Sequence, residues 1–178
     1  MLHLTTLQTG LLVLPGGLMM GVLGPVIGRL YDLFGPRPLL IPGLALATVG
    51  LLLLGTVTET TAAWQVLVYH VLLSLGLSSV LPSVFTAGLS AVPQRFTSYG
   101  SAIFATVQQV GGAAGTAMAI ALLAVGSSGW HGTGGAAAAA ASGTRLAFLV
   151  TAGIFVVAIA LSLMVKRVEG NGPVPVGH

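Results

Sequence analysis

Hydrophobic positions in this chain form five long runs, and no series of short alternating segments of the β-barrel type appears. Each run holds about 20 or more residues without an Asp, Glu, Lys or Arg in its interior, the length that a helix needs to cross a bilayer core of about 30 Å. The predicted spans are residues 5–27, 38–57, 64–87, 99–125 and 145–165. We therefore predict an all-α fold, a polytopic membrane helix bundle with about five transmembrane helices over residues 1–168.

The composition agrees with a protein dissolved in lipid. Of the 178 residues, 55% are hydrophobic and only 5% are charged, and the mean hydropathy is +1.02. A soluble domain carries about 25% charged residues, so lipid must be the solvent for most of this chain. The net charge of +3 does not indicate a nucleic-acid partner, because the six Lys and Arg residues form no basic patch. The absence of cysteine excludes disulfides and thiol chemistry.

The cations predict how the helices are oriented. If the connection between the first two spans is cytoplasmic, alternation places five of the six cations inside: Arg29, Arg37, Arg95, Lys166 and Arg167. We therefore expect a multi-pass protein of the cell membrane whose C-terminal residues 169–178 form a disordered cytoplasmic tail. The N-terminus then lies outside, with too few residues before the first span for another helix. We expect that at least one helix precedes this sequence in a longer chain.

Two connections between spans differ in character. Residues 28–37 are expected to form an inner loop that holds two arginines and one aspartate. Residues 126–144 are rich in glycine and alanine and are expected to form a mobile outer loop. The alanine run at 136–141 favours helix, but six residues are too few to hold one alone in water.

Polar side chains inside the spans are candidates for function, because intramembrane polar groups usually face the bundle interior or a water-filled cavity. The candidate cavity-lining residues are His70, Ser74, Ser78, Thr106, Gln108 and Gln109. The first three follow one another at i, i+4 and i+8 and share one helix face. Two interpretations of His70 stay open, a neutral imidazole hydrogen-bonded to a neighbouring helix and a protonatable or substrate-contacting group. The adjacent glutamines point about 100° apart, so only one of them can face a cavity.

Glycine spacing predicts close packing between helices. Four glycines of the first span share one helix face, and others in the fourth span form a similar surface. These residues are Gly17, Gly21, Gly24 and Gly28, and then Gly111, Gly112 and Gly115. The chain has 26 glycines over several helices, which favours tight packing inside one bundle over a dedicated dimer face.

The sequence contains no recognisable enzyme site. It lacks a phosphate-binding loop, a metal-ligand cluster and a nucleophile elbow, and none of its acids lies within a span. We therefore expect no catalytic residue, no metal and no cofactor. Two alternatives to a transport role remain open: a structural or assembly subunit of a membrane complex, and an intramembrane enzyme, for which only His70 with Ser74 comes near.

The connection between the first two spans carries a family resemblance. Gly28, Asp32, Gly35 and Arg37, with Arg29 beside them, resemble the G-x-x-x-D-[RK]-x-G-x-[RK] signature of the major facilitator superfamily, a cytoplasmic gating or structural element. Leu33 and Pro38 stand where the signature often has cations, which suits a degenerate copy from the second half of such a protein. The segments 14–17, 35–40, 100–102 and 108–115 are similar to the fourteen-helix drug:proton antiporter branch.

This resemblance implies a fold and a function. It implies that the five spans are the last five of the six helices in the C-terminal half, with the first, third and fourth bordering the cavity and the second and fifth peripheral. It implies export of hydrophobic, often cationic, small molecules in exchange for protons by alternating access between two halves. It also implies a missing or separately encoded N-terminal half as partner, so this chain alone is not expected to transport.

Overall fold

The computed structural model describes residues 6–58, 60–129 and 135–164. Its elements, in order, are α1 (Thr6–Phe34), α2 (Arg37–Leu54), α3 (Ala63–Ser90), the 3-10 segment η1 (Gln94–Phe96), α4 (Thr97–Ser128) and α5 (Gly135–Ser162). In this part of the chain there is no strand, and five helices are long and apolar enough to cross a membrane. The prediction of an all-α membrane helix bundle is confirmed.

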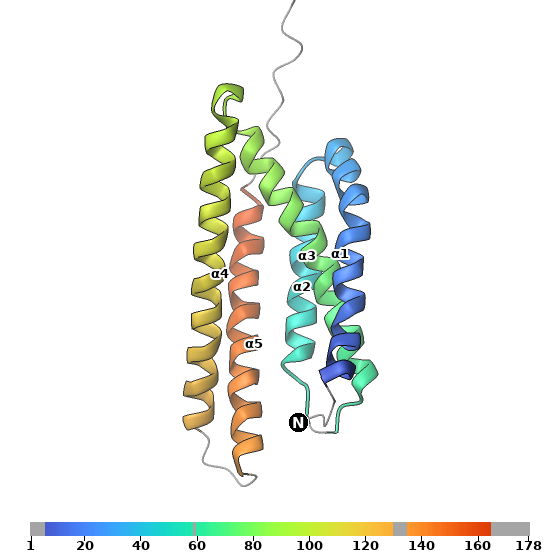
Figure 1. Ribbon diagram of the computed structural model, residues 1–178, viewed down its shortest axis with the longest axis vertical. Helices are drawn as coiled ribbons and strands as arrows, with labels where there is room; N and C mark the ends of the chain where they lie inside the picture. Colours follow the sequence, from blue (N-terminus) through green and yellow to red (C-terminus); the bar gives the residue numbers. More distant parts are fainter. Residues whose placement is uncertain (1–5, 59, 130–134, 165–178) are drawn as a thin grey trace, which may run out of the picture.

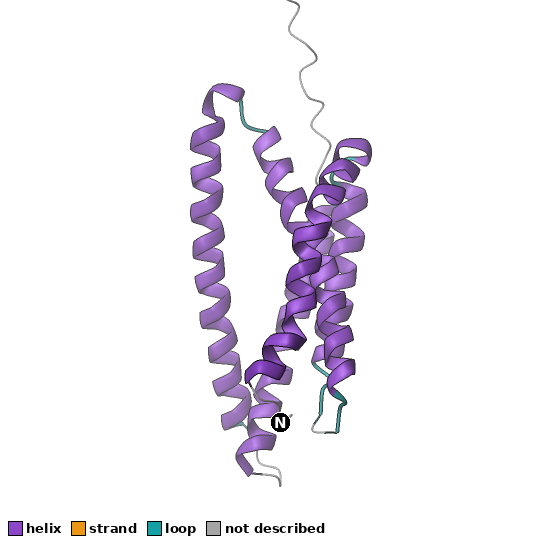
Figure 2. Cartoon of the chain, turned by 45° about the vertical axis from the view of Figure 1, so that its right-hand side comes forward, coloured by secondary structure: helices purple, strands orange, loops and turns teal. Residues whose placement is uncertain are grey.

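The helices form an elongated bundle in which α2 is central (Figure 1). α2 packs along α3 and α5, α1 packs mainly along α3, and α4 packs along α5. α4 also meets α3 near the connection that joins them, and farther along it stands apart from α1 and α3 (Figure 2). Within the core, the buried residues Leu40, Leu44 and Val80 form one cluster, with Phe155, Ala158 and Ile159 of α5 packed against it.

Two glycines allow α2 and α3 to approach closely. A Cβ added at Gly76 of α3 would lie 2.6 Å from the backbone nitrogen of Ala47. One added at Gly50 of α2 would lie 2.8 Å from the backbone nitrogen of Leu73. The obstructing atoms are backbone and cannot rotate away, so the absence of a side chain sets the distance between these two helices.

The helix α5 begins ten residues before the predicted span. The alanine run 136–141 is helical. The prediction of a mobile outer loop at 126–144 is therefore wrong for residues 126–128, which belong to α4, and for residues 135–144. The neighbouring α4 explains the difference: the Ser142 hydroxyl donates to the Gly126 carbonyl at 2.7 Å, and a Cβ added at Gly126 would lie 2.5 Å from the Cα of Gly143. Most helical stability in proteins comes from tertiary packing, and α4 supplies it here.

The predicted inner loop at residues 28–37 is also mostly helical, because α1 continues to Phe34 and α2 starts at Arg37. The last two turns of α1 hold three motif residues, Gly28, Arg29 and Asp32. Gly35 makes the reversal: its φ is +80°, and its N–H donates to the Tyr31 carbonyl at 2.8 Å. This left-handed conformation after a helix end favours glycine, which has no Cβ to clash.

Three arginines gather at one end of the bundle, which we call the arginine end. Arg29 lies near the end of α1, Arg37 starts α2, and Arg95 lies in η1 (Figure 1). Arg145 is exposed on α5. It lies about 15 Å along the helix from Gly135, where α5 starts at the end of the bundle opposite the arginine end. The remaining cations and the predicted tail lie outside the described residues: Lys166, Arg167 and 169–178.

Candidate functional site

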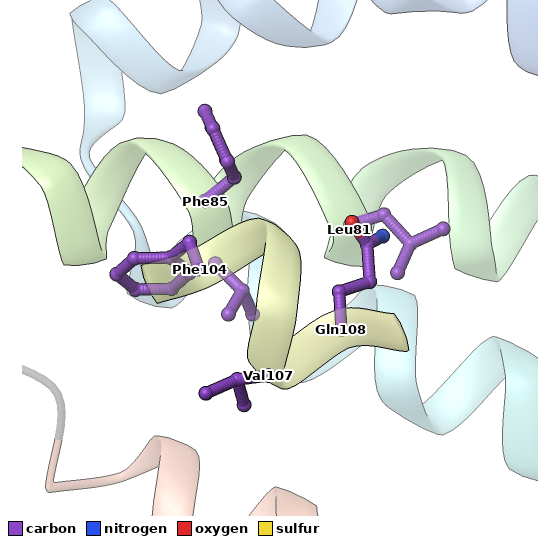
Figure 3. A pocket seen from close by; sticks show the side chains of 6 residues that line it. Leu81, Phe85, Phe104, Val107 and Gln108 are labelled. Atoms are coloured by element: carbon purple, nitrogen blue, oxygen red, sulfur yellow. The ribbon is translucent and has the colours of Figure 1, made fainter. Parts of the chain in front are cut away.

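An apolar pocket lies between α3 and α4 (Figure 3). Its lining residues, 81–85 and 104–108, lie in the half of the bundle nearer the arginine end. Its volume is about 240 Å³. It is lined by Leu81, Val84 and Phe85 of α3 and by Phe104, Val107 and Gln108 of α4. Sites for drug-sized ligands measure about 300–1,000 Å³, so this pocket can hold part of such a molecule.

Two phenylalanines form the wall of the pocket toward the arginine end. The rings of Phe85 and Phe104 meet edge to face, with centroids 5.7 Å apart and planes at 70°. The Phe104 ring also lies against Gly88, in the space that a side chain at that position would need. Phe104 is thus held between one aromatic ring and one bare stretch of backbone, and an edge-to-face pair adds about 0.5–1.5 kcal/mol beyond its buried area.

Gln108 is the polar side chain among the six lining residues. It extends from α4 toward α3 beside Leu81 (Figure 3). Among the described residues its amide has no hydrogen-bond partner, so two donors and one acceptor remain available to a ligand. Both Gln108 and Gln109 are exposed, but Gln109 does not line the pocket. The structure therefore brings one glutamine of the pair to the pocket, as the geometry of a helix requires.

The other polar candidates do not line this pocket. The buried Ser74 and Ser78 hydroxyls donate to carbonyls of their own helix, at 2.9 and 2.7 Å. The exposed Thr106 hydroxyl donates to the Ala102 carbonyl one turn earlier, at 2.9 Å. His70 is half-buried against α1 in the other half of the bundle. Any contact of these four with a cavity of a larger assembly remains a prediction.

Most of the pocket lining was missed from the sequence, where the search considered polar residues. The aliphatic and aromatic lining residues cannot be told apart in the sequence from the other apolar residues, because 55% of the chain is hydrophobic. One signal was present: Phe85 and Phe104 are two of only six phenylalanines in the chain.

The glycines predicted to pack helices lie on open faces of α1 and α4. A Cβ added at any of them would meet nothing within 4 Å in the described part of the chain. They are Gly17, Gly21, Gly24, Gly28, Gly111, Gly112 and Gly115. Packing inside this bundle instead uses glycines that the spacing did not single out, such as Gly76 and Gly50. A packing role for these seven glycines remains a prediction and requires a surface outside the described residues.

The motif residue Arg37 joins the start of α2 to the end of α5. Its guanidinium donates to the carbonyl of Leu163 at 2.8 Å. Leu163 directly follows the last residue of α5, where the carbonyls point out of the helix and carry its partial negative charge. This hydrogen bond ties the motif to the C-terminal end of α5, 126 residues away along the chain.

Comparison with known proteins gives one family. The model of the Major Facilitator Superfamily matches residues 1–177. The lincomycin resistance protein LmrB of Listeria monocytogenes is 42% identical over 125 residues, which cover 70% of this chain and 26% of the relative. YcnB of Bacillus subtilis, an uncharacterized MFS-type transporter, is 37% identical over 164 residues, 92% of this chain and 34% of the relative.

A more distant relative is the multidrug resistance protein Stp of Mycobacterium tuberculosis, 29% identical over 116 residues, which cover 65% of this chain and 21% of that protein. No solved structure matches the chain. The chain spans about a quarter to a third of the length of LmrB and YcnB. With five helices of membrane-spanning length and a family match over nearly every residue, the chain belongs to the major facilitator superfamily of multi-pass membrane transporters.

Proposed function

We propose that this chain is part of a proton-driven exporter of hydrophobic small molecules, and that the pocket between α3 and α4 is part of its substrate cavity. The observation that carries the proposal is the apolar pocket lined by one amide, that of Gln108, which has no hydrogen-bond partner among the residues that the structure describes. The family match favours a transporter over a structural or assembly subunit. Two relatives are named for lincomycin resistance and multidrug resistance, which supports drug-like substrates.

The chemistry of the lining selects a class of substrate. The faces of Phe85 and Phe104 and the aliphatic walls favour flat or aliphatic apolar groups, because burial removes their surface from water. Gln108 favours molecules that also carry a hydrogen-bonding group at one edge. Aromatic faces attract cations as well. The substrate class is therefore hydrophobic, often cationic, and of drug size.

The complete cavity requires more protein than this chain. Among the described helices, α3 and α4 line the pocket. The open faces of α1 and α4 carry small residues that allow close approach of another helix, Gly17, Gly21, Gly24, Gly111 and Gly115. We assign these faces to contact with the N-terminal half of the transporter. Alternating access needs two halves that rock against each other, so the chain alone does not transport.

The proposed location is the cell membrane, with the arginine end and the C-terminus in the cytoplasm. The placement of Arg29, Arg37 and Arg95 at one end supports this orientation, since cations favour the cytoplasmic side. We assign no enzymatic reaction and no cofactor to the chain.

A binding measurement tests the proposal. The purified chain in lipid nanodiscs is titrated with a fluorescent hydrophobic cation such as ethidium. Gln108→Leu should weaken binding about threefold to tenfold, the equivalent of one hydrogen bond of about 1 kcal/mol. Gln109→Leu, the adjacent residue outside the pocket, is the matched control and should bind like the parent chain. Equal affinity in both variants would remove the pocket from the proposal.

The aromatic wall gives a second comparison. Phe104→Ala removes the ring that lines the pocket, whereas Ile103→Ala shortens an exposed neighbour that does not line it. We expect the first change to weaken binding of the probe and the second to leave binding unchanged. The reverse order would show that the probe binds the outer surface of α4.

A further inference from the structure

His70 lies in α3 away from the pocket, seven residues after the helix start at Ala63. At 1.5 Å per residue it is about 10 Å from the end of the helix that lies opposite the arginine end. Its ring is half-buried against α1: a Cβ added at Gly16 would lie 2.8 Å from Nε2 of His70 and would overlap the Ser74 hydroxyl. The bare backbone at Gly16 thus gives the imidazole its place between the two helices.

The imidazole has no hydrogen bond within the described residues. The Ser74 hydroxyl, which lies beside Gly16 as the imidazole does, already donates its proton to the backbone carbonyl of His70 at 2.9 Å. The interpretation of His70 as an imidazole hydrogen-bonded to a neighbouring helix therefore finds no partner in this part of the structure. An ionisable side chain inside a membrane span without such a bond is a candidate for a functional group.

Within the described residues, no charged side chain of the packed helices faces His70. The charged residues of α1 and α2 are Arg29, Asp32 and Arg37, all at the arginine end. Arg29, the nearest of them to Gly16 along α1, is about 20 Å away. The remaining titratable side chains of these helices are Tyr31 of α1, also at the arginine end, and Tyr69, next to His70 on α3. The Asp and Glu residues of the described helices thus offer no counter-ion for an imidazolium at this position.

We propose that His70 is the proton-binding residue of this chain, and that its protonation releases the contact between α3 and α1 at Gly16. This inference rests on the proposed function only in giving the proton a transport role. A neutral imidazole tolerates the apolar contact, whereas an imidazolium carries two N–H donors and a charge that require water or an acceptor. Since no such group adjoins it in the described residues, α1 moves away and water enters.

The position also fits the direction of proton movement. His70 is close to the end of the bundle opposite the arginines, which the proposed orientation places outside the cell. A proton from the outer medium therefore has to cross about a quarter of the length of α3 to reach it. Imidazole is the side chain whose ordinary titration falls between pH 5 and 8, the range in which an inward proton gradient acts.

Proton uptake is measured directly by NMR. A triple variant with His3→Gln, His131→Gln and His178→Gln retains His70 as the sole histidine of the chain. In nanodiscs without substrate, its imidazole carbon signals should move through a protonation step as the pH falls from 8 to 5. Signals that stay constant over this range would overturn the proposal. No drug is present, so this outcome is independent of whether the pocket binds substrate.

The movement of α1 is measured by spin labelling, which the cysteine-free chain permits. Labels on cysteines at the exposed positions Leu11 of α1 and Val68 of α3 report the separation of the two helices. The distance should increase by about 2 Å or more at pH 5, and His70→Gln should abolish the change. A titration without a distance change, or an equal change in His70→Gln, would refute the coupling to α1.

Discussion

Substitution of Gly76 by alanine should force α2 and α3 apart. The added Cβ would lie 2.6 Å from the backbone nitrogen and 2.8 Å from the Cβ of Ala47, while ordinary contacts begin at 3.4 Å. The helices must therefore separate by several tenths of an ångström at their closest point. Gly112 of α4 is the matched control, because a Cβ added there meets nothing within 4 Å.

The magnitude follows from two opposing terms. Overpacking a close contact costs about 1–3 kcal/mol. Replacing glycine by alanine inside a helix gains up to about 1 kcal/mol at either position. The gain cancels when the two variants are compared, so Gly76→Ala should be less stable than Gly112→Ala by about 1–3 kcal/mol, the steric term alone.

The assay is equilibrium unfolding of both variants in mixed detergent micelles, followed by far-UV circular dichroism. Gly76→Ala should have the lowest free energy of unfolding of the three proteins. The parent chain and Gly112→Ala should both be more stable. If Gly76→Ala equals or exceeds Gly112→Ala in stability, α2 and α3 do not pack through this glycine, and the central position of α2 is wrong.

Three further predictions concern the motif and the orientation. Gly35→Ala should lower the free energy of unfolding by about 1–2 kcal/mol, because the φ of +80° disfavours a Cβ, and unchanged stability would contradict this turn. Arg37→Gln removes the charged donor to Leu163 and should therefore speed hydrogen–deuterium exchange in the last turn of α5, while α4 exchanges as before. Equal exchange in α5 of the parent chain and of Arg37→Gln would contradict the hydrogen bond between Arg37 and Leu163. In intact cells, a cysteine at Ser128 should react with an impermeant reagent and one at Gln94 should not, and the reverse result would invert the orientation.

The fold class was predictable because the bilayer imposes it. A chain with so few charges must be solvated by lipid, and runs of membrane-spanning length then have to be helices. Helix ends were not predictable in the same way. Arg29 and Asp32 suggested a loop, yet charged residues fit the last turns of a helix that leaves the membrane. The alanine run 136–141 suggested a loop, yet α4 supports it as helix.

Of the six residues that line the pocket, one was among the candidates named from the sequence. A polar side chain stands out against an apolar span, so Gln108 was found, and helix geometry limited the pair to one glutamine in the pocket. Phe104 gave no such contrast, because packing partners depend on which helices meet. Glycine spacing has the same limit: it predicts a face that allows close approach, but only the structure shows that Gly76 is covered and Gly111 is open.

Efflux by a chimaera tests the central claim most directly. This chain replaces the matching segment of LmrB from Listeria monocytogenes, and proton-gradient-dependent efflux of a hydrophobic cationic dye is measured in a drug-sensitive bacterium. We predict efflux by the chimaera, a clear reduction with Gln108→Leu, parent-level efflux with Gln109→Leu, and none by the 178-residue chain alone. Robust efflux by the chain alone, or a chimaera whose efflux is indifferent to Gln108, would contradict the account.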